Sequence, residues 1–293
     1  MESTAFDETT RIEKLTAALH EIDKKTNEQW MATLDARKVA ELEFHDRDRD
    51  PARAVPEAGG TADTANKKYY STVGLSRSHE SDWIRHHAKG RVFLDYACGN
   101  GDHAIAAALA GAALTIGVDI SSVSIENCRQ RAVEASVAEK TFFVQGDCEN
   151  TGLPSNSVDL VIGDGILHHL DLSYVFPELR RVMRPGGRYY GREALKYNPV
   201  IKLYRQLTPS MRTEWEKRHI LSLRDLRFAK HFFEVRNIRY WHLCSIPVTA
   251  LRNTPAFKGA LTVANALDSV LLRVPPISLM AWMFSFELVK RKE

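Results

Sequence analysis

The sequence predicts an α/β fold in which a seven-stranded, mostly parallel sheet carries helices on both faces. From Arg91 onward, short and continuously apolar runs alternate with helical segments, and this alternation is typical of parallel strands that are buried on both sides. The last run follows a long helical stretch, so we expect it to insert antiparallel to its neighbour. The seven expected strands are residues 92–97, 114–120, 141–147, 158–166, 187–195, 234–246 and 278–292.

The segments outside these strands have the apolar spacing of helices. Before the sheet, Ile12, Leu15, Leu19 and Ile22 recur at helical intervals and predict an N-terminal helical arm within residues 1–45. A charged stretch with prolines and paired glycines follows at 46–66, where we expect a loop or linker. Further helices are expected near residues 101–112, 122–135, 172–183, 199–232 and 255–273.

The composition narrows the class of protein. It is 44% hydrophobic and 26% charged, which is ordinary for a globular domain. A net charge of +3 is too small to indicate nucleic acid as a partner. The four cysteines lack the spacing of zinc ligands, so we expect reduced thiols and no metal. The chain has neither a signal-peptide pattern nor a run of 18 apolar residues, so we expect a cytoplasmic protein with no transmembrane segment.

The segment LDYACGNG, residues 94–101, lies between the first expected strand and the helix that follows it. Its glycines allow a sharp turn and a close approach to a ligand, and the N-terminus of the next helix offers free N–H groups to a carboxylate. Asp95 ends the strand, where its carboxylate can accept a hydrogen bond from an ammonium group, directly or through water. The loop therefore suits the zwitterionic end of an amino acid.

Acidic residues also close the next strands, at the edge where open α/β sheets bind ligands. Asp119 ends the second strand, where an acid can accept hydrogen bonds from both hydroxyls of a ribose, and Ile120 can pack on an adenine. Asp147 ends the third strand and can accept a hydrogen bond from the adenine amino group. Asp164 and Gly165 end the fourth. Because these acids close successive strands, we predict that they bind an adenosyl amino acid together.

LDYACGNG resembles motif I of the class I methyltransferases, which have a Rossmann-like fold. GVDIS, QGDCENTGLPSNSVDLVIGDGILHHL and RVMRPGG resemble the later motifs of the type 11 small-molecule group. The resemblance covers about residues 91–195 and implies S-adenosyl-L-methionine as the cofactor. Ala97 departs from the pattern, which usually has its first glycine there; we expect a negative φ that tolerates alanine. The cofactor contacts predicted from the motifs are Asp95, Ala97, Cys98, Gly99, Asn100, Gly101, Asp119, Ile120, Asp147, Cys148, Asp164, Gly165 and His169.

These expectations divide the chain into an N-terminal arm and linker over residues 1–66 and a methyltransferase domain over residues 67–293. Within that domain, residues 91–195 are expected to form the cofactor core. Helical insertions after the fifth and sixth strands are expected within residues 196–277, where they would form a lid on the substrate side.

The implied reaction is an in-line SN2 transfer of a methyl group that is already activated, so positioning and exclusion of water can supply much of the catalysis. A base is needed only if the acceptor must lose a proton. The candidate catalytic residues are His168, His169, Glu193 and Tyr197. The two histidines have an alternative role in lining the cofactor pocket, and Glu193 has an alternative as a buried residue paired with Arg192 or Lys196.

Two regions outside the motifs have open interpretations. Tyr69 and Tyr70 precede the core and are candidate lid residues that contact the substrate, or they pack against the N-terminal helix. The apolar segment 255–284 is expected to belong to the core and the sheet. The alternative is a wall for a greasy acceptor, or a peripheral contact with a membrane surface.

The sequence thus predicts an S-adenosylmethionine-dependent methyltransferase that acts on a small or medium-sized biosynthetic intermediate. O-methylation is favoured; the alternatives are a lipid-like acceptor and methyl transfer to carbon or nitrogen. An NAD(P)-binding oxidoreductase is disfavoured because the loop lacks the spacing G-x-G-x-x-G. A nucleic-acid substrate is disfavoured because residues 163–166, GDGI, stand where an N-P-P-[FY] loop would be needed. A non-catalytic cofactor-binding protein is the remaining alternative. The oligomeric state is open, a homodimer included.

Overall fold

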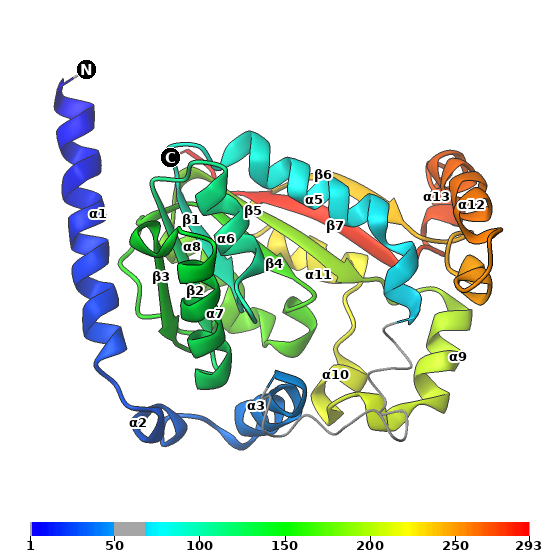
Figure 1. Cartoon of the computed structure of the whole chain (residues 1–293), viewed down its shortest axis with the longest axis horizontal. Coiled ribbons are helices and arrows are strands. Elements are labelled where there is room, and N and C mark those ends of the chain that lie inside the picture. The colour runs from blue at the N-terminus through cyan, green and yellow to red at the C-terminus, as the bar shows by residue number, and fades with distance from the viewer. Residues whose placement is uncertain (1, 50–67, 293) are drawn as a thin grey trace.

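The computed structural model describes residues 2–49 and 68–292, and its centre is one sheet of seven strands in the order β3-β2-β1-β4-β5-β7-β6 (Figure 1). Strands β1 to β5 are parallel, and β7 pairs antiparallel with both β5 and β6. The predicted α/β fold, with its antiparallel last strand, is confirmed. The strands are β1 (Val92–Tyr96), β2 (Leu114–Asp119), β3 (Thr141–Gln145), β4 (Val158–Asp164), β5 (Met183–Ala194), β6 (Glu234–Trp241) and β7 (Met283–Val289).

Helices cover both faces of the sheet, as expected for strands with continuously buried residues. On one face, Trp83 and Ile84 pack against Phe93 and Tyr190 of the sheet. On the other face, Phe176 belongs to the larger core cluster. The first face carries α5 (Gly74–His87), α6 (Asp102–Leu109) and α7 (Ser122–Glu134), and the second carries α8 (Leu172–Val182) and α11 (Leu223–Ala229).

The helical insertions lie after β5 and β6, as predicted. After β5 come α9 (Pro199–Leu207), η4 (Pro209–Met211), α10 (Glu214–Arg218) and α11. After β6 come η5 (Pro247–Leu251), α12 (Phe257–Leu271) and α13 (Pro275–Ser278). Three further short 3-10 helices are η1 (Lys68–Thr72), η2 (Ala138–Lys140) and η3 (Leu167–His169).

The N-terminal arm consists of α1 (Glu2–Asp23), α2 (Asn27–Met31) and α3 (Ala36–Arg49), and it packs on the domain rather than standing apart. Helix α1 runs along the β3 edge of the sheet (Figure 1), and Leu15 and Leu19 on its inner side are fully buried. The Arg11 guanidinium lies 3.0 Å from a carboxylate oxygen of Asp159. The linker expected from residue 46 is wrong at its start, because α3 continues to Arg49; residues 50–66 of that linker lie outside the described residues.

The structure adds one helix and moves several strand boundaries, among them that of β7, which spans Met283–Val289 where 278–292 was expected. The helix α5 was not predicted. Strand β5 begins at Met183, because an irregular register with β4 absorbs the expected Arg184–Gly187 turn. Strand β6 ends at Trp241 rather than 246, because the chain turns at His242 with φ 64°. The Asp268 carboxylate of α12 then accepts hydrogen bonds from the N–H groups of the next three residues, Leu243, Cys244 and Ser245.

The apolar segment 255–284 divides into two parts. Phe284 of β7 is fully buried, so the core interpretation is confirmed there. Helix α12 buries Ala264 but exposes Val263 (62%), Leu267 (50%) and Val270 (64%), so the core interpretation is wrong for that exposed face alone. Among the described helices, none combines the length and the apolar character that a membrane crossing requires.

Candidate functional site

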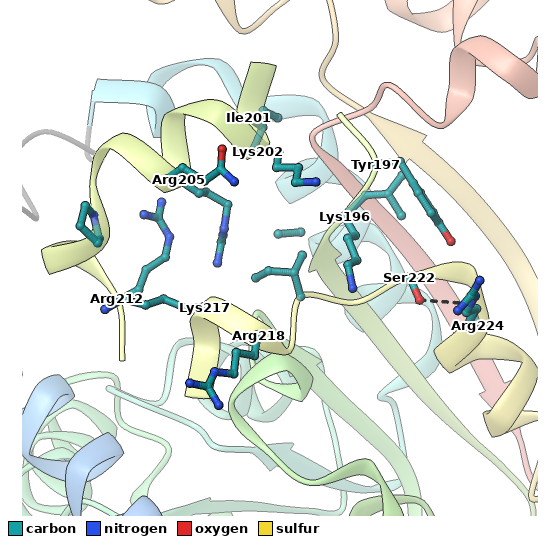
Figure 2. Close-up of a pocket in the computed structure, with 15 residues that line it drawn as sticks. Lys196, Tyr197, Ile201, Lys202, Arg205, Arg212, Lys217, Arg218, Ser222 and Arg224 are labelled. Atoms are coloured by element: carbon teal, nitrogen blue, oxygen red, sulfur yellow. Dashed lines mark hydrogen bonds between the residues drawn. The ribbon is translucent and has the colours of Figure 1, made fainter. Parts of the chain in front are cut away.

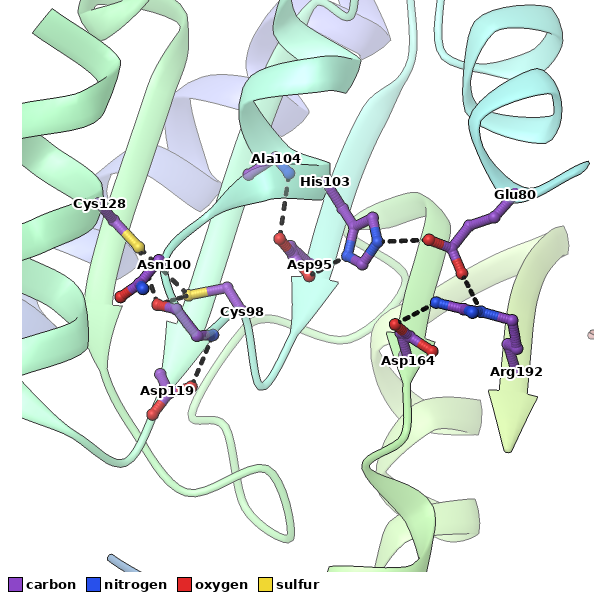
Figure 3. Close-up of polar contacts among 12 residues, drawn as sticks. Glu80, Asp95, Cys98, Asn100, His103, Ala104, Asp119, Cys128, Asp164 and Arg192 are labelled. Atoms are coloured by element: carbon purple, nitrogen blue, oxygen red, sulfur yellow. Dashed lines mark hydrogen bonds and ion pairs between the residues drawn. The ribbon is translucent and has the colours of Figure 1, made fainter. Parts of the chain in front are cut away.

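The loop after β1 is fixed to the end of β2 by backbone hydrogen bonds (Figure 3). The N–H of Gly99 donates to Oδ2 of Asp119 at 2.8 Å, and Oδ1 of Asp119 accepts from the N–H of Ser121 at 2.9 Å. Gly101 precedes α6 with φ 79°, and a Cβ added there would lie 2.9 Å from Sγ of Cys128. Backbone conformation and close packing therefore both require glycine at 101.

Ala97 adopts a left-handed conformation with φ 58°. The expectation of a negative φ at this position is therefore wrong. The left-handed conformation crowds the Cβ against the following carbonyl and costs a non-glycine residue roughly 1–2 kcal/mol. The chain makes the turn that a glycine would make, with strain stored at the one position that departs from the motif.

A cavity of about 120 Å³ lies beyond the carboxyl ends of β1 to β4, at the edge where the strand-closing acids were expected to meet. The structure brings eight of the predicted cofactor residues together around it: Ala97, Asp119, Ile120, Asp147, Cys148, Asp164, Gly165 and His169. The other predicted residues of the loop, Cys98, Gly99, Asn100 and Gly101, shape the turn and do not line this cavity.

Asp95 supports the loop from beneath (Figure 3). Its side chain is buried, and Oδ2 accepts a hydrogen bond from the N–H of Ala104 at 3.0 Å. Oδ1 lies 3.5 Å from Nδ1 of His103. Burial raises the pKa of Asp95 above its usual value. Its predicted contact with an ammonium group remains a prediction, because Asp95 lies behind the loop and not on the cavity wall.

Helix α3 forms the wall opposite the strand ends, a role that the sequence analysis missed. Nζ of Lys38 lies 2.5 Å from Oδ2 of Asp147 and 3.0 Å from Oε2 of Glu149. Arg37 donates to the backbone carbonyl of His169 at 3.1 Å. The helical spacing of charged residues could have indicated this face, which comprises Arg37, Lys38, Glu41, Leu42 and His45.

Glu193 is fully buried at the end of β5 and holds His168 in place. Its Oε1 accepts hydrogen bonds from the N–H groups of Ile166 (2.9 Å) and Leu167 (2.7 Å). Its Oε2 lies 2.7 Å from Nδ1 of His168. Burial opposes a charged ring, but the Glu193 carboxylate outweighs it and raises the pKa of His168 above the usual value. Glu193 is buried, as its alternative interpretation expected, but its partner is His168 and Arg192 pairs with Glu80 and Asp164 instead.

His169 lies beside His168 but has a different environment. The two ring centroids are 4.1 Å apart, and Nδ1 of His169 lies 2.8 Å from Oε2 of Glu41 on α3. Burial and the neighbouring His168 lower the pKa of His169 below its usual value. His169 lines the cofactor cavity, which fits the pocket-lining role that was considered for it.

A second cavity, of about 490 Å³, adjoins the first, and His45, Asp164, Gly165 and His169 border both. It is lined by His168 and by aromatic rings. The Tyr69 ring lies 5.7 Å from Tyr204 and 6.3 Å from Trp282 between centroids, and Tyr70 lies 6.2 Å from Trp282. Both tyrosines line this cavity, as the lid interpretation expects.

Tyr197 lies apart from the histidines. It lines a third cavity, and its hydroxyl oxygen accepts a hydrogen bond from the N–H of Leu223 at 3.0 Å. The structure therefore does not place Tyr197 with His168 and Glu193.

A buried charge network behind the second cavity was also missed (Figure 3). The Arg192 guanidinium lies 2.8 Å from Glu80 and 2.5 Å from Asp164. The other Glu80 oxygen lies 2.6 Å from Nε2 of His103. Burial raises the pKa of Asp164 to about 6. Two clusters each bring three potential metal ligands together: Glu80, His103 and Asp164 form one, and Glu41, His45 and His169 form the other. In the first cluster both carboxylates already pair with Arg192.

Comparisons with known proteins agree with this geometry. A family profile described as a methyltransferase domain matches residues 94–191, which run from β1 into β5. The match covers most of the predicted cofactor core and leaves out the N-terminal arm and the helical insertions. The predicted resemblance is thereby confirmed over the segment that holds the strand ends and the glycine loop.

The methyltransferase domain has named relatives. It is 37% identical over 100 residues to 27-O-demethylrifamycin SV methyltransferase of Amycolatopsis mediterranei, a match that covers 34% of this chain and 37% of that protein. It is 32% identical over 121 residues to demethylmenaquinone methyltransferase of Lactiplantibacillus plantarum, covering 40% of this chain and 51% of the relative. The matched region thus spans between about a third and a half of these relatives.

Solved structures share the fold over most of the chain. Geranyl diphosphate C-methyltransferase from Streptomyces coelicolor, solved with Mg²⁺, geranyl diphosphate and S-adenosyl-L-homocysteine, matches with a TM-score of 0.58 and 16% identity. The match covers 88% of this chain and 99% of the other. At this identity the likeness shows the class I methyltransferase fold alone.

Proposed function

We propose that this protein is an S-adenosylmethionine-dependent methyltransferase that acts on a small or medium-sized biosynthetic intermediate, with O-methylation favoured. One observation carries the proposal: eight residues predicted from the motifs line one cavity at the strand ends, and that cavity adjoins a larger one lined by aromatic rings and His168. A cofactor cavity beside an acceptor cavity is the arrangement that group transfer between two small molecules needs.

The residues of the first cavity fit the chemistry of the cofactor. Asp119 and Asp147 provide carboxylate acceptors for the ribose hydroxyls and the adenine amino group, and Ile120 provides an apolar surface for the adenine. The left-handed turn at Ala97 brings the backbone of the loop to the cavity wall, and the glycines after it let the loop close tightly against Asp119. When bound, S-adenosylmethionine supplies an activated methyl group.

The second cavity supports an acceptor of small or medium size. Its volume of about 490 Å³ lies within the range of small-molecule sites, roughly 300–1,000 Å³. Part of its wall comes from helix α9 and the segment after it, which agrees with a substrate-side role for residues 196–277. His168, held by Glu193, is positioned to accept a proton from an acceptor hydroxyl when its ring is neutral, and this position favours O-methylation.

Calorimetry with S-adenosylhomocysteine tests the cofactor assignment. We expect the wild-type protein to bind, and the variant Asp119→Asn to bind roughly 10- to 100-fold more weakly, because the amide loses the charge offered to the ribose and can no longer accept both backbone hydrogen bonds that hold the loop in place. Asp23→Asn is the matched control, because Asp23 pairs only with the exposed Arg129 across the surface. A wild-type protein that binds NADH but neither S-adenosylmethionine nor S-adenosylhomocysteine would overturn the proposal.

An assay of methyl transfer distinguishes an enzyme from a protein that only binds the cofactor. Incubation with S-adenosylmethionine labelled in its methyl group and a panel of hydroxyl, amine and carbon acceptors should label a hydroxylated small molecule. Tight cofactor binding without transfer to any acceptor of the panel would favour a non-catalytic binding protein. Transfer to carbon or nitrogen alone would contradict the favoured O-methylation.

A further inference from the structure

A third cavity, of about 640 Å³, lies between α9, α10 and the segment that follows β5 (Figure 2). Seven of the side chains that line it are cationic, and among the described residues none of the lining side chains is a carboxylate. The net charge of the whole chain is only +3, so this cavity concentrates positive charge that the rest of the molecule does not have.

Four of these cations have no acidic partner among the side chains that the structure describes, residues 8–46 and 68–292. They are Lys196, Lys202, Arg218 and Arg224, and all four are exposed at the cavity. Lys217 is the exception on this rim, because it pairs with Glu214. Unpaired cations that gather around one concave space raise the local concentration of anions there.

Two further cations, Arg205 (half-buried) and Arg212 (buried), share one carboxylate oxygen. The Arg205 guanidinium lies 2.8 Å from Oε1 of Glu216, and Nε of Arg212 lies 3.5 Å from the same atom. Burial and the neighbouring Arg212 lower the pKa of Arg205, and burial lowers the pKa of Arg212. One carboxylate does not neutralise two guanidinium groups that are largely shielded from water, so the pair carries an excess positive charge that a bound anion would offset.

The basic cavity adjoins the second cavity. Ala194, Ile201, Arg205 and Arg212 line both, and the second cavity contains His168. Figure 2 shows Lys196, Lys202, Arg205 and Arg212 arranged around one open space. A molecule whose charged end lies among these cations can therefore extend past Ile201 toward the aromatic rings beside the cofactor cavity.

We propose that the cavity lined by Lys196, Lys202, Arg205 and Arg212 binds a phosphate or diphosphate group of the methyl acceptor, which makes the acceptor a phosphorylated small molecule. The inference rests on the proposed function and specifies its substrate class. A single carboxylate group carries one charge and is satisfied by one guanidinium. The number of cations here instead matches a group with several negative charges, and arginine side chains suit phosphate oxygens because they donate two parallel hydrogen bonds.

Calorimetry with inorganic pyrophosphate tests this site apart from cofactor binding. We expect the wild-type protein to bind pyrophosphate, and the double variant Lys196→Gln/Lys202→Gln to bind at least about tenfold more weakly, because two unpaired cations are lost. Both lysines are exposed and have no ion pair in the described chain, so the thermal unfolding midpoint should stay unchanged and show that the variant folds. The matched control is Lys24→Gln/Lys258→Gln, which removes the same charge from two exposed positions that do not line the cavity and should keep wild-type affinity.

Pyrophosphate that binds the wild type and the cavity double variant equally would overturn the inference, and so would the absence of any pyrophosphate binding. Succinate serves as the carboxylate probe, and succinate that binds as tightly as pyrophosphate would refute a phosphate-specific site. These outcomes are distinguishable from failure of the proposed function, because S-adenosylhomocysteine binding is measured in the same preparation and does not depend on Lys196 or Lys202.

Discussion

Nδ1 of His168 lies 2.7 Å from Oε2 of Glu193, and the other oxygen of Glu193 accepts two backbone hydrogen bonds from the turn that carries His168. The carboxylate therefore fixes both the ring and the backbone beneath it. A histidine held in this way presents its other nitrogen to the second cavity with a defined orientation.

The first prediction concerns the pH dependence of methyl transfer. Only the neutral imidazole accepts a proton, and the pKa of His168 is raised, so we expect kcat/KM to fall as pH decreases through that raised pKa. In Glu193→Gln the oxygen that accepts the backbone bonds is retained but the charge is lost, so the acidic limb of the profile should move to lower pH. An acidic limb that stays at the same pH in this variant would exclude His168 as the base.

The same pair predicts a pH-dependent stability. Because the folded state raises the pKa of His168, the pair stabilises the fold fully below the usual histidine pKa of about 6.5, and this stabilisation is lost as pH rises through the raised value. Glu193→Gln should therefore lower the unfolding midpoint more at pH about 6 than at pH about 9, measured by thermal melts in matched buffers. An equal loss at both values would show that the His168 charge contributes nothing.

A further prediction concerns Ala97 and its left-handed backbone. Replacing it with glycine removes roughly 1–2 kcal/mol of steric cost and adds about 0.5–1 kcal/mol of conformational entropy loss, so Ala97→Gly should stabilise the fold by up to about 1.5 kcal/mol. Urea unfolding measures this difference. Ala106→Gly in α6 is the control and should destabilise the protein, because a helix interior disfavours glycine. A loss of stability in Ala97→Gly would contradict the strain.

The strand ends could be predicted from sequence because two general rules place them. Apolar runs mark buried parallel strands, and parallel strands end at one edge, so Asp119, Asp147 and Asp164 had to meet. Those rules say nothing about the sign of φ at Ala97, which depends on how the whole turn closes.

Sequence patterns also could not identify partners that only tertiary packing brings together. Glu80 and Arg192 are 112 positions apart, and Lys38 and Asp147 are 109 apart. Glu80, Arg192 and Lys38 each look like an ordinary solvated charge on a helix or strand. Their pairing follows from where α5 and α3 cross the sheet edge, which no periodicity in the chain encodes.

Helix α3 leads to a prediction about cofactor entry. The cavity at the strand ends holds only about 120 Å³, below the roughly 300 Å³ of the smallest usual ligand sites, and Lys38 bonds Asp147 across it. We expect α3 to move when the cofactor enters. Lys38→Gln should then raise the association rate constant of S-adenosylhomocysteine by roughly tenfold, equivalent to about 1.4 kcal/mol, in stopped-flow fluorescence. Lys24→Gln, which loses only the exposed pair with Glu21, should keep the wild-type rate. A wild-type rate in Lys38→Gln would mean that α3 does not limit entry.

The last prediction addresses the stability of the buried network. Glu80 is 4% exposed and pairs with both Arg192 and His103. In Glu80→Gln the Arg192 guanidinium keeps only the Asp164 carboxylate among these partners, and His103 loses the negative charge beside its Nε2. Breaking a buried pair by removing one partner typically costs about 3–5 kcal/mol, and we expect the free energy of unfolding in urea to fall by about 3 kcal/mol. Asp82→Asn is the matched control on the same helix, because its pair with Arg85 is exposed and should contribute less than about 1 kcal/mol. If both variants lose a similar free energy of unfolding, the buried network contributes no more to stability than an exposed ion pair. Arg192 would then be held by the packing of α5 and not by charge.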